Sequence, residues 1–329
     1  MTGRMWRLRR MLPLVVAVVM MMVVAVGCSS PADDESVGGS VQIILPDGRS
    51  VTVPETPRRI VTLGGQWTDV LLAFDKTPVG YYDATETLTH QTPPWYGNKL
   101  ADSTALHVDD QIVANVAKLD PDLIVAPGFA SMSGEFEKLS QIAPTIDKIS
   151  GSQVDPWQDM VTLMGTILHE PEKAQQIIAG VDDKISGIAR EYPGLQGKTY
   201  SFAYMYGSDQ FSVLGDPNDG AGKLFSSLGL SMAPRVIAQA QSTGEPRFAL
   251  SVENLGWLDS DLLVIATENE GLRKRLVGLP GYKNLRSVKS DAVTQMTQMS
   301  VTGLNEPSPG ATVYVLDQLR PALARAAGE

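Results

Sequence analysis

The longest helical stretch of this sequence has no strand beside it, and this limits the folds open to the chain. Pro171 is typical of a helix start, and the residues from Glu172 to Glu191 keep a helical apolar spacing for roughly five turns. On either side, short apolar segments typical of buried strands alternate with helical segments, which indicates an α/β fold. We therefore predict two α/β lobes, residues 41–170 and 193–329, joined by one helix over residues 171–192.

The first lobe is predicted to open with a hairpin, because residues 41–45 and 50–53 are apolar or alternating around the turn signal Pro46–Arg49. Strands and helices then follow one another, with strands at 59–63, 78–82, 122–126 and 145–149, and helices at 67–74, 111–118, 134–139 and 157–169. In the second lobe we expect strands at 199–204, 211–214 and 261–265, a helix at 222–228 and a last helix after Pro309.

The N-terminus has the pattern of a secretion signal. Four arginines (Arg4, Arg7, Arg9 and Arg10) precede an apolar run from Met11 to Val26. This run is shorter than the ~20 residues that cross a bilayer and contains Pro13, so a cleaved signal over residues 1–27 fits better than a permanent membrane helix.

Small residues lead directly into Cys28, a pattern that resembles the bacterial lipobox. Cys28 is the only cysteine of the chain, so it can form no internal disulfide, and a lipid anchor explains its presence. Residues 28–40 are small, acidic and without apolar periodicity, which predicts a flexible tether. We expect the protein to be anchored at Cys28 on the outer face of the cytoplasmic membrane.

The charge balance limits the partners. Removal of residues 1–27 takes away four basic residues and no acid, which changes the formal net charge from −10 to −14. Nucleic acids and anionic membrane surfaces require Lys and Arg to neutralise phosphate, so neither is an expected partner. About 300 residues remain, enough for two cores of ordinary size.

The enzyme motifs considered are incomplete or missing in this sequence. Residues 219–224 superficially resemble a phosphate loop, but the first glycine of that motif falls on Pro217, and Leu224 replaces the magnesium-binding hydroxyl. We predict a glycine-rich turn that leads into a helix. There is no G-x-S-x-G motif, and the single cysteine belongs to the signal, so acyl transfer lacks its usual groups.

The three histidines give no metal motif, since His90, His107 and His169 are far apart and form no H-x-x-x-H pair. We expect no protein-bound metal and no cofactor. A carboxylate site is harder to exclude, because acids are plentiful.

Aromatic residues make up only 6% of the chain, yet several follow predicted strands. In open α/β sheets ligands bind beyond the carboxyl ends of the strands. Tyr81 and Tyr82 end a strand, and Pro93–Gly97 is a stiff loop that carries Trp95. Such rings suit a large, partly apolar ligand, with packing in the core as the alternative.

Several segments resemble the substrate-binding lipoproteins of ATP-driven importers, of the class that serves iron-siderophore, haem and cobalamin uptake. The strand at 57–63 and the helix after it are similar to the start of that family's fold. Further similarity lies in Leu119–Val125 (L-x-P-D-L-I), Leu139–Thr145 (L-x-x-I-A-P-T), the long helix and Leu250–Leu255.

The resemblance implies two Rossmann-like lobes bridged by a single long α-helix, as in class III periplasmic binding proteins, with a fairly rigid cleft between them. It also implies an acid on each lobe that docks to arginines of the permease. Glu253 matches the second-lobe position. The first-lobe position falls near Asp109 or Asp110, and we assign it to Asp110.

The same resemblance places ligand residues in the cleft. Gln66 and Trp67 occupy the position of a Thr-Glu pair at the start of the first helix, and Trp95 resembles a loop tryptophan of related iron lipoproteins. Arg247 supplies a cation for an anionic ligand. The full set of expected ligand-binding residues is Gln66, Trp67, Tyr81, Tyr82, Trp95, Tyr206, Arg247 and Asn305.

We therefore expect a monomeric, non-catalytic protein that captures a ferric siderophore and delivers it to an ABC importer permease. Haem or cobalamin is the alternative ligand within this class. A non-catalytic scaffold of the envelope is the alternative from a different class.

Overall fold

The first lobe is built on a parallel sheet. The computed structural model describes residues 39–107, 111–126, 134–152 and 154–329. Five short strands pair in the order β5-β4-β3-β6-β7, all parallel, and β3 and β6 are fully buried. They are β3 (Ile60–Thr62), β4 (Gly80–Tyr81), β5 (Thr104–Ala105), β6 (Leu123–Val125) and β7 (Thr145–Ile146).

Helical segments connect these strands, as parallel pairing requires, and one more helix follows the last strand. They are α1 (Gly65–Ala73), α2 (Ala84–Thr89), α3 (Ile112–Ala117), α5 (Phe136–Ser140) and α6 (Trp157–Ile167), with a 3-10 turn η1 (Pro94–Tyr96). The predicted hairpin is confirmed as β1 (Ser40–Ile44) and β2 (Ser50–Pro54), in a register that pairs Ser40 with Pro54. It buries Ile43 and Val53 against the core that also holds α1 and α6.

The second lobe has a mixed sheet in the order β11-β9-β8-β12-β13, with β10 also pairing with β8. β9 runs antiparallel to both β8 and β11. Between β8 and β9, residues 206–209 form a turn too short for the crossover that parallel pairing needs. The strands are β8 (Thr199–Met205), β9 (Gln210–Leu214), β10 (Ser231–Met232), β11 (Arg247–Ser251), β12 (Leu262–Thr267) and β13 (Val293–Met296).

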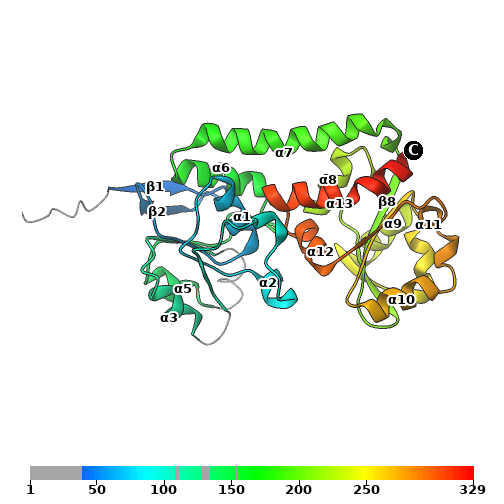
Figure 1. Ribbon diagram of the computed structural model, residues 1–329, viewed down its shortest axis with the longest axis horizontal. Helices are drawn as coiled ribbons and strands as arrows, with labels where there is room; N and C mark the ends of the chain where they lie inside the picture. The colour runs from blue at the N-terminus through cyan, green and yellow to red at the C-terminus, as the bar shows by residue number, and fades with distance from the viewer. Residues whose placement is uncertain (1–38, 108–110, 127–133, 153) are drawn as a thin grey trace, which may run out of the picture. The chain divides into compact units, whose positions relative to one another are not determined.

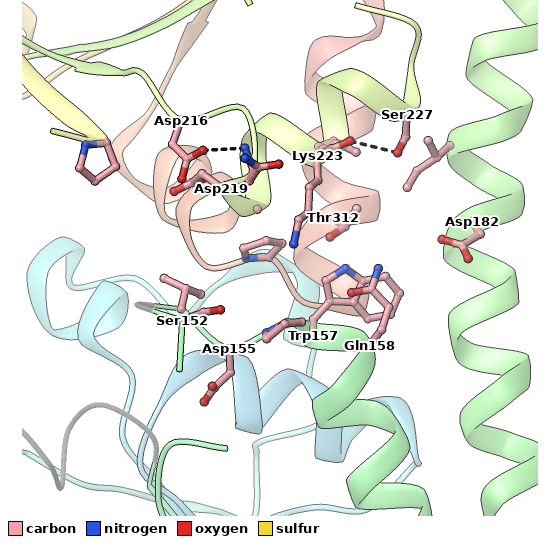
Figure 2. Close-up of a pocket in the computed structure, with 18 of the residues that line it drawn as sticks. Ser152, Asp155, Trp157, Gln158, Asp182, Asp216, Asp219, Lys223, Ser227 and Thr312 are labelled. Atoms are coloured by element: carbon pink, nitrogen blue, oxygen red, sulfur yellow. Dashed lines mark hydrogen bonds between the residues drawn. The ribbon is translucent and has the colours of Figure 1, made fainter. Parts of the chain in front are cut away.

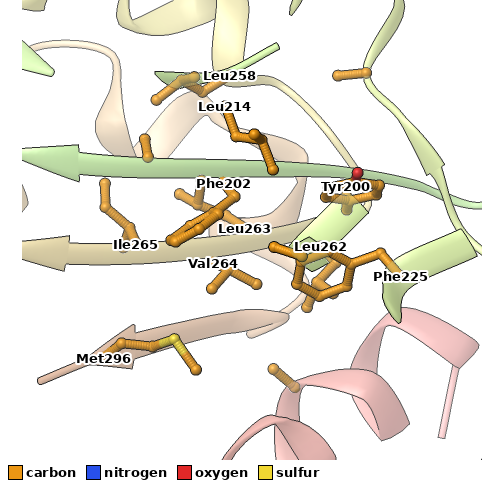
Figure 3. Close-up of a cluster of buried hydrophobic side chains, with 14 of the residues drawn as sticks. Tyr200, Phe202, Leu214, Phe225, Leu258, Leu262, Leu263, Val264, Ile265 and Met296 are labelled. Atoms are coloured by element: carbon orange, nitrogen blue, oxygen red, sulfur yellow. The ribbon is translucent and has the colours of Figure 1, made fainter. Parts of the chain in front are cut away.

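Helices of the second lobe pack on this sheet. Figure 3 shows Tyr200 of β8 against Phe225, with ring centroids 4.3 Å apart. The predicted glycine-rich turn is confirmed, since Asp219 caps the following helix by accepting from the Ala221 N–H. The elements are α8 (Gly220–Ser227), α9 (Pro234–Thr243), α10 (Glu270–Gly278), α11 (Arg286–Lys289), α12 (Gln298–Asn305), α13 (Pro309–Ala327), η2 (Pro193–Leu195), η3 (Val252–Leu258) and η4 (Tyr282–Asn284).

The long helix predicted from the sequence is α7 (Pro171–Glu191), about 32 Å in length at 1.5 Å per residue. It packs along α6 (Figure 1) and buries Ala174 and Val181 in the first core. Farther along, Ile188 is buried in the second core, and Ile185 packs against both cores. This confirms two α/β lobes bridged by one helix.

The C-terminal segment forms a second connection. α13 contributes most of its buried residues to the second core, but its Val313 packs against the first. The amide of Gln66 donates to the Pro307 carbonyl oxygen at 2.6 Å. Part of the predicted second lobe, from Pro307 to Val313, therefore contacts the first lobe.

A buried carboxylate strengthens this connection. Asp69 on α1 is only 3% exposed, and its Oδ2 accepts from the backbone N–H groups of Gly310 (2.6 Å) and Ala311 (3.2 Å) at the start of α13. Unpaired N–H groups at a helix start favour an anion. Burial nevertheless raises the pKa of Asp69 to about 6, because desolvation outweighs the hydrogen bonds from Ser308, Gly310 and Ala311.

Within the described residues, we find no helix that combines the length and apolar character needed to span a membrane.

The contact between α6 and α7 gives a stability prediction. A Cβ on Gly165 would lie 2.6 Å from the Ala174 Cβ and 3.2 Å from the Glu170 carbonyl oxygen. We expect Gly165→Ala to lower the free energy of unfolding by about 1–3 kcal/mol. On the open side of α7, Gly187→Ala should leave it unchanged or raise it by up to about 1 kcal/mol. Urea unfolding of both variants checks this, and equal stability of the two would contradict the packing.

Asp69 gives a pH prediction. Its folded-state pKa lies above the ordinary value of 3.8, so the folded protein keeps a proton that the unfolded chain has already released. The contribution of Asp69 to stability is therefore complete below pH 4 and is lost as the pH rises through about 6. Asn does not titrate. The unfolding free energy of Asp69→Asn, relative to that of the wild type, should therefore rise by about 2 kcal/mol between pH 4 and pH 7. A constant difference in urea unfolding at the two pH values would refute this.

Candidate functional site

A cavity of about 440 Å³ lies where the two lobes meet (Figure 2). Its walls come from the loop between β7 and α6, from α7, from α8 and the loop before it, from the start of β11, and from residues Pro307 and Thr312. This volume is within the range of small-molecule sites, and a position between lobes is a common place for them.

One part of the wall is apolar. Trp157 opens α6 and is 6% exposed, and Ile185, Leu224 and two prolines, Pro246 and Pro307, lie around the same cavity. Pro156 precedes the helix and leaves its first N–H groups without a side-chain cap. An indole ring together with aliphatic side chains provides area for the organic part of a ligand.

The cavity wall also holds a guanidinium in a fixed position. Arg247 Nη2 donates to Asp219 Oδ2 at 3.1 Å and to Asn305 Oδ1 at 3.0 Å. Asp219 is itself fixed as the cap of α8, so the arginine is held by two anchored acceptors. Arginine has five N–H donors, and about a third of this side chain is exposed. It can therefore donate further hydrogen bonds to ligand oxygens.

Other polar groups line the cavity. Asp155 is buried and accepts from the N–H groups of Ile149 and Ser150 and from the Ser150 hydroxyl. Lys223 is exposed and extends from α8 toward Trp157 (Figure 2). The hydroxyl of Thr312 is buried without a hydrogen-bond partner among the described residues. The cavity thus presents both donors and acceptors.

Two of the residues predicted from the sequence meet here. Arg247 lines the cavity and is hydrogen-bonded to Asn305, although 58 positions separate them. Gln66 is buried next to this site, with its amide on the Pro307 carbonyl oxygen. It supports the cavity wall through that bond.

Trp95 does not line this cavity and packs instead against two other aromatic rings. Its ring is 5.5 Å from that of Tyr314 on α13 and 5.9 Å from that of Tyr96, measured between centroids. It borders a second, very small pocket shared by α2 and α12. Its ring is only partly buried, and its contact with ligand stays a prediction.

Of two further expected ligand residues, Trp67 does not fit the structure, and the ligand contact of Tyr206 stays a prediction. Trp67 is fully buried in the first core, because its position on α1 faces the sheet, so its ring is not available to a ligand. Tyr206 bonds Gln210 at the start of β9, whereas Arg247 pairs with Leu214 at the end of that strand. The antiparallel hairpin therefore carries Tyr206 to the opposite end of the sheet from Arg247.

Tyr81 and Tyr82 belong to another region. Tyr81 lines a pocket of about 370 Å³ with His90 and His107, which the structure brings together although they are far apart in sequence. Burial, with help from the neighbouring Glu86, raises the pKa of Tyr81 to about 12, and burial also raises the pKa of Tyr82. Both shifts disfavour the phenolate form that ferric iron requires as a ligand. Among the described residues, no group of three or more His, Cys, Asp or Glu is arranged to hold a metal ion.

Three predicted residues remain, namely Glu253, Cys28 and Asp110. Glu253 is exposed in the first turn of η3, where it is free to meet a partner. Cys28 and Asp110, with its neighbour Asp109, lie outside the described residues.

Three residues that line the cavity were not predicted from the sequence, namely Trp157, Asp155 and Lys223. Asp155 and Trp157 follow β7, and the rule that ligands bind beyond the carboxyl ends of parallel strands would have pointed to them. No sequence signal distinguished Lys223 from a surface lysine.

Comparison with known proteins finds curated relatives that are named as binding proteins. A curated relative from Bacillus subtilis (strain 168), named as the probable siderophore-binding lipoprotein YfiY, is 26% identical over 258 residues, covering 74% of this chain and 76% of its own. A second from the same organism, the Fe(3+)-citrate-binding protein YfmC, is 24% identical over 273 residues, covering 81% of this chain and 83% of its own.

A solved structure of a periplasmic solute binding protein from Mycobacterium smegmatis superposes with a TM-score of 0.72 at 27% identity, over 88% of this chain and 99% of that one. The family model described as periplasmic binding protein matches residues 60–298. Since that match spans most of the chain, including both sheets and the helix between them, the chain belongs to the periplasmic binding protein family.

Proposed function

We propose that this protein captures a ferric siderophore outside the cytoplasmic membrane and delivers it to the permease of an ABC importer. The cavity between the lobes is the observation that carries the proposal, because it combines an indole, an anchored arginine and free polar groups. The two curated relatives are named for binding a siderophore and ferric citrate. Both names describe iron complexes of small organic ligands.

The geometry suits such a ligand. A siderophore surrounds the iron with its own oxygens, so the protein has to recognise the organic frame rather than the metal. In the cavity, Trp157 covers apolar parts of the frame, and Arg247 and Lys223 donate to its outer oxygens. Capture requires no bond to form or break, and the importer supplies the energy of transport.

Anchoring and docking belong to the same proposal. Residues 28–40 serve as the tether, with lipid on Cys28. On the second lobe, the exposed Glu253 meets an arginine of the permease, and Asp110 does so on the first lobe.

Tryptophan fluorescence titration tests the proposed function. The purified protein is titrated with ferric siderophores, their iron-free forms, haem and cobalamin, with subtraction of ligand absorbance. Saturable quenching by a ferric siderophore at submicromolar concentration is the expected result. Tight binding of haem or cobalamin alone would replace the proposed ligand, and no binding across the panel would favour the envelope scaffold.

A substitution at Arg247 gives the most direct test of the proposed ligand site. Lysine keeps the charge but loses the planar fork that Asp219 and Asn305 hold in place. We expect Arg247→Lys to weaken siderophore binding at least tenfold, about 1.4 kcal/mol. Arg235→Lys, an exposed position on α9 outside the cavity, is the matched control and should bind like wild type. Equal affinity of both variants would remove Arg247 from the site.

The lipid anchor is tested separately. Cys28→Ser removes the acceptor sulfur, so the protein should leave the membrane fraction while its siderophore affinity stays unchanged. Cell fractionation followed by titration measures both. Retention of this variant in the membrane would contradict the anchor.

A further inference from the structure

The charges around the cavity are unequal. The described residues that line it include four aspartates, Asp155, Asp182, Asp216 and Asp219, but only two cations, Lys223 and Arg247. The formal excess is two negative charges. An excess of one sign in a pocket with low-dielectric walls favours ligands of the opposite charge and disfavours ligands of the same charge.

Ion pairing within the protein makes the excess of negative charge around the cavity clearer. Arg247 forms an ion pair with Asp219, so its positive charge is already balanced within the protein. Asp155 and Asp216 accept only from neutral donors and have no cationic partner among the described residues. Asp182 has neither a hydrogen bond nor an ion pair within the described part of the chain. Asp182 and Asp216 therefore outnumber Lys223 among the lining groups without an ion pair, and the buried Asp155 adds a further acid to the wall.

A second, independent feature indicates which ligand atoms the site accepts. Thr312 is 3% exposed in the wall of the cavity, and its hydroxyl has no partner among the described residues. A buried hydroxyl without a partner costs free energy, and a ligand oxygen that accepts from it removes that cost. A neutral amide or hydroxamate carbonyl suffices for this purpose.

We propose that this cavity selects ferric complexes that are neutral or carry one positive charge, and discriminates against anionic ones. The inference rests on the proposed function. Three hydroxamates neutralise Fe³⁺, and a pendant ammonium group adds one positive charge. Three catecholates leave the complex with a charge of about −3, and ferric citrate is also anionic. Like charges across an interface suppress binding of the wrong partner.

Asp182 is the residue we assign to this selection. It lies on α7, which both cores hold in place, and Figure 2 shows its carboxylate on the side of the helix that faces the cavity. Its side chain is exposed, so its replacement leaves the fold intact. The next residue, Asp183, has the same charge and exposure but does not line the cavity. Asp182→Asn and Asp183→Asn therefore form a matched pair.

The experiment compares ferrioxamine B, which carries a terminal ammonium, neutral ferrichrome, and two anionic probes, ferric citrate and ferric enterobactin. For the wild-type protein, ferrioxamine B or ferrichrome should bind at least about tenfold more tightly than either anionic probe. Asp182→Asn should weaken ferrioxamine B about fivefold and ferrichrome less than about twofold, because only the first carries a charge. Asp183→Asn should change both by less than about twofold.

The outcomes separate the two proposals. Tighter binding of an anionic probe, or equal binding of all four, would overturn the charge selection and leave the proposed function standing. Equal effects of Asp182→Asn and Asp183→Asn on ferrioxamine B would overturn the assignment of the selection to this cavity. If no ferric complex binds, the proposed function itself fails.

Discussion

The structure depends on the contact between the Asp69 carboxylate and the first N–H groups of α13. A buried carboxylate is costly, and here the start of α13, the Ser308 hydroxyl and the charge of Lys99 compensate for part of that cost. The contact holds residues 307–312 in a fixed position on α1. Pro307 and Thr312 belong to this segment and line the cavity, so the tie between the lobes also sets one wall of the site.

Two connections between the lobes limit their relative motion. α7 joins the cores through Ile185, and the segment around α13 joins them again through Gln66, Asp69 and Val313. A single linker can act as a hinge, but two packed helices that both reach the two cores restrict rotation. A ligand therefore meets a cavity that is largely formed before it binds, which lowers the cost of ordering side chains on binding.

The sequence predicted the elements better than the site. Strands β3, β6 and β12 are continuous apolar runs with turn residues at their ends, so local pattern alone located them. Arg247 and Asn305 were also predicted, and the structure places them in contact. Trp67 was misplaced because an aromatic residue at the start of a helix suits a core or a cleft equally well, and only the direction of α1 against its sheet decides between them.

Periodicity and motifs within short segments were enough to predict the two α/β lobes, the long helix between them and the resemblance to importer-associated binding proteins. The residues that meet between the lobes are known only from the folded chain. Asp69 reaches α13, Arg247 reaches Asn305, and Trp157, Lys223 and Asp182 line one cavity although they come from three different helices. Such contacts depend on how helices pack across two cores, and that packing is a property of the whole chain rather than of any segment.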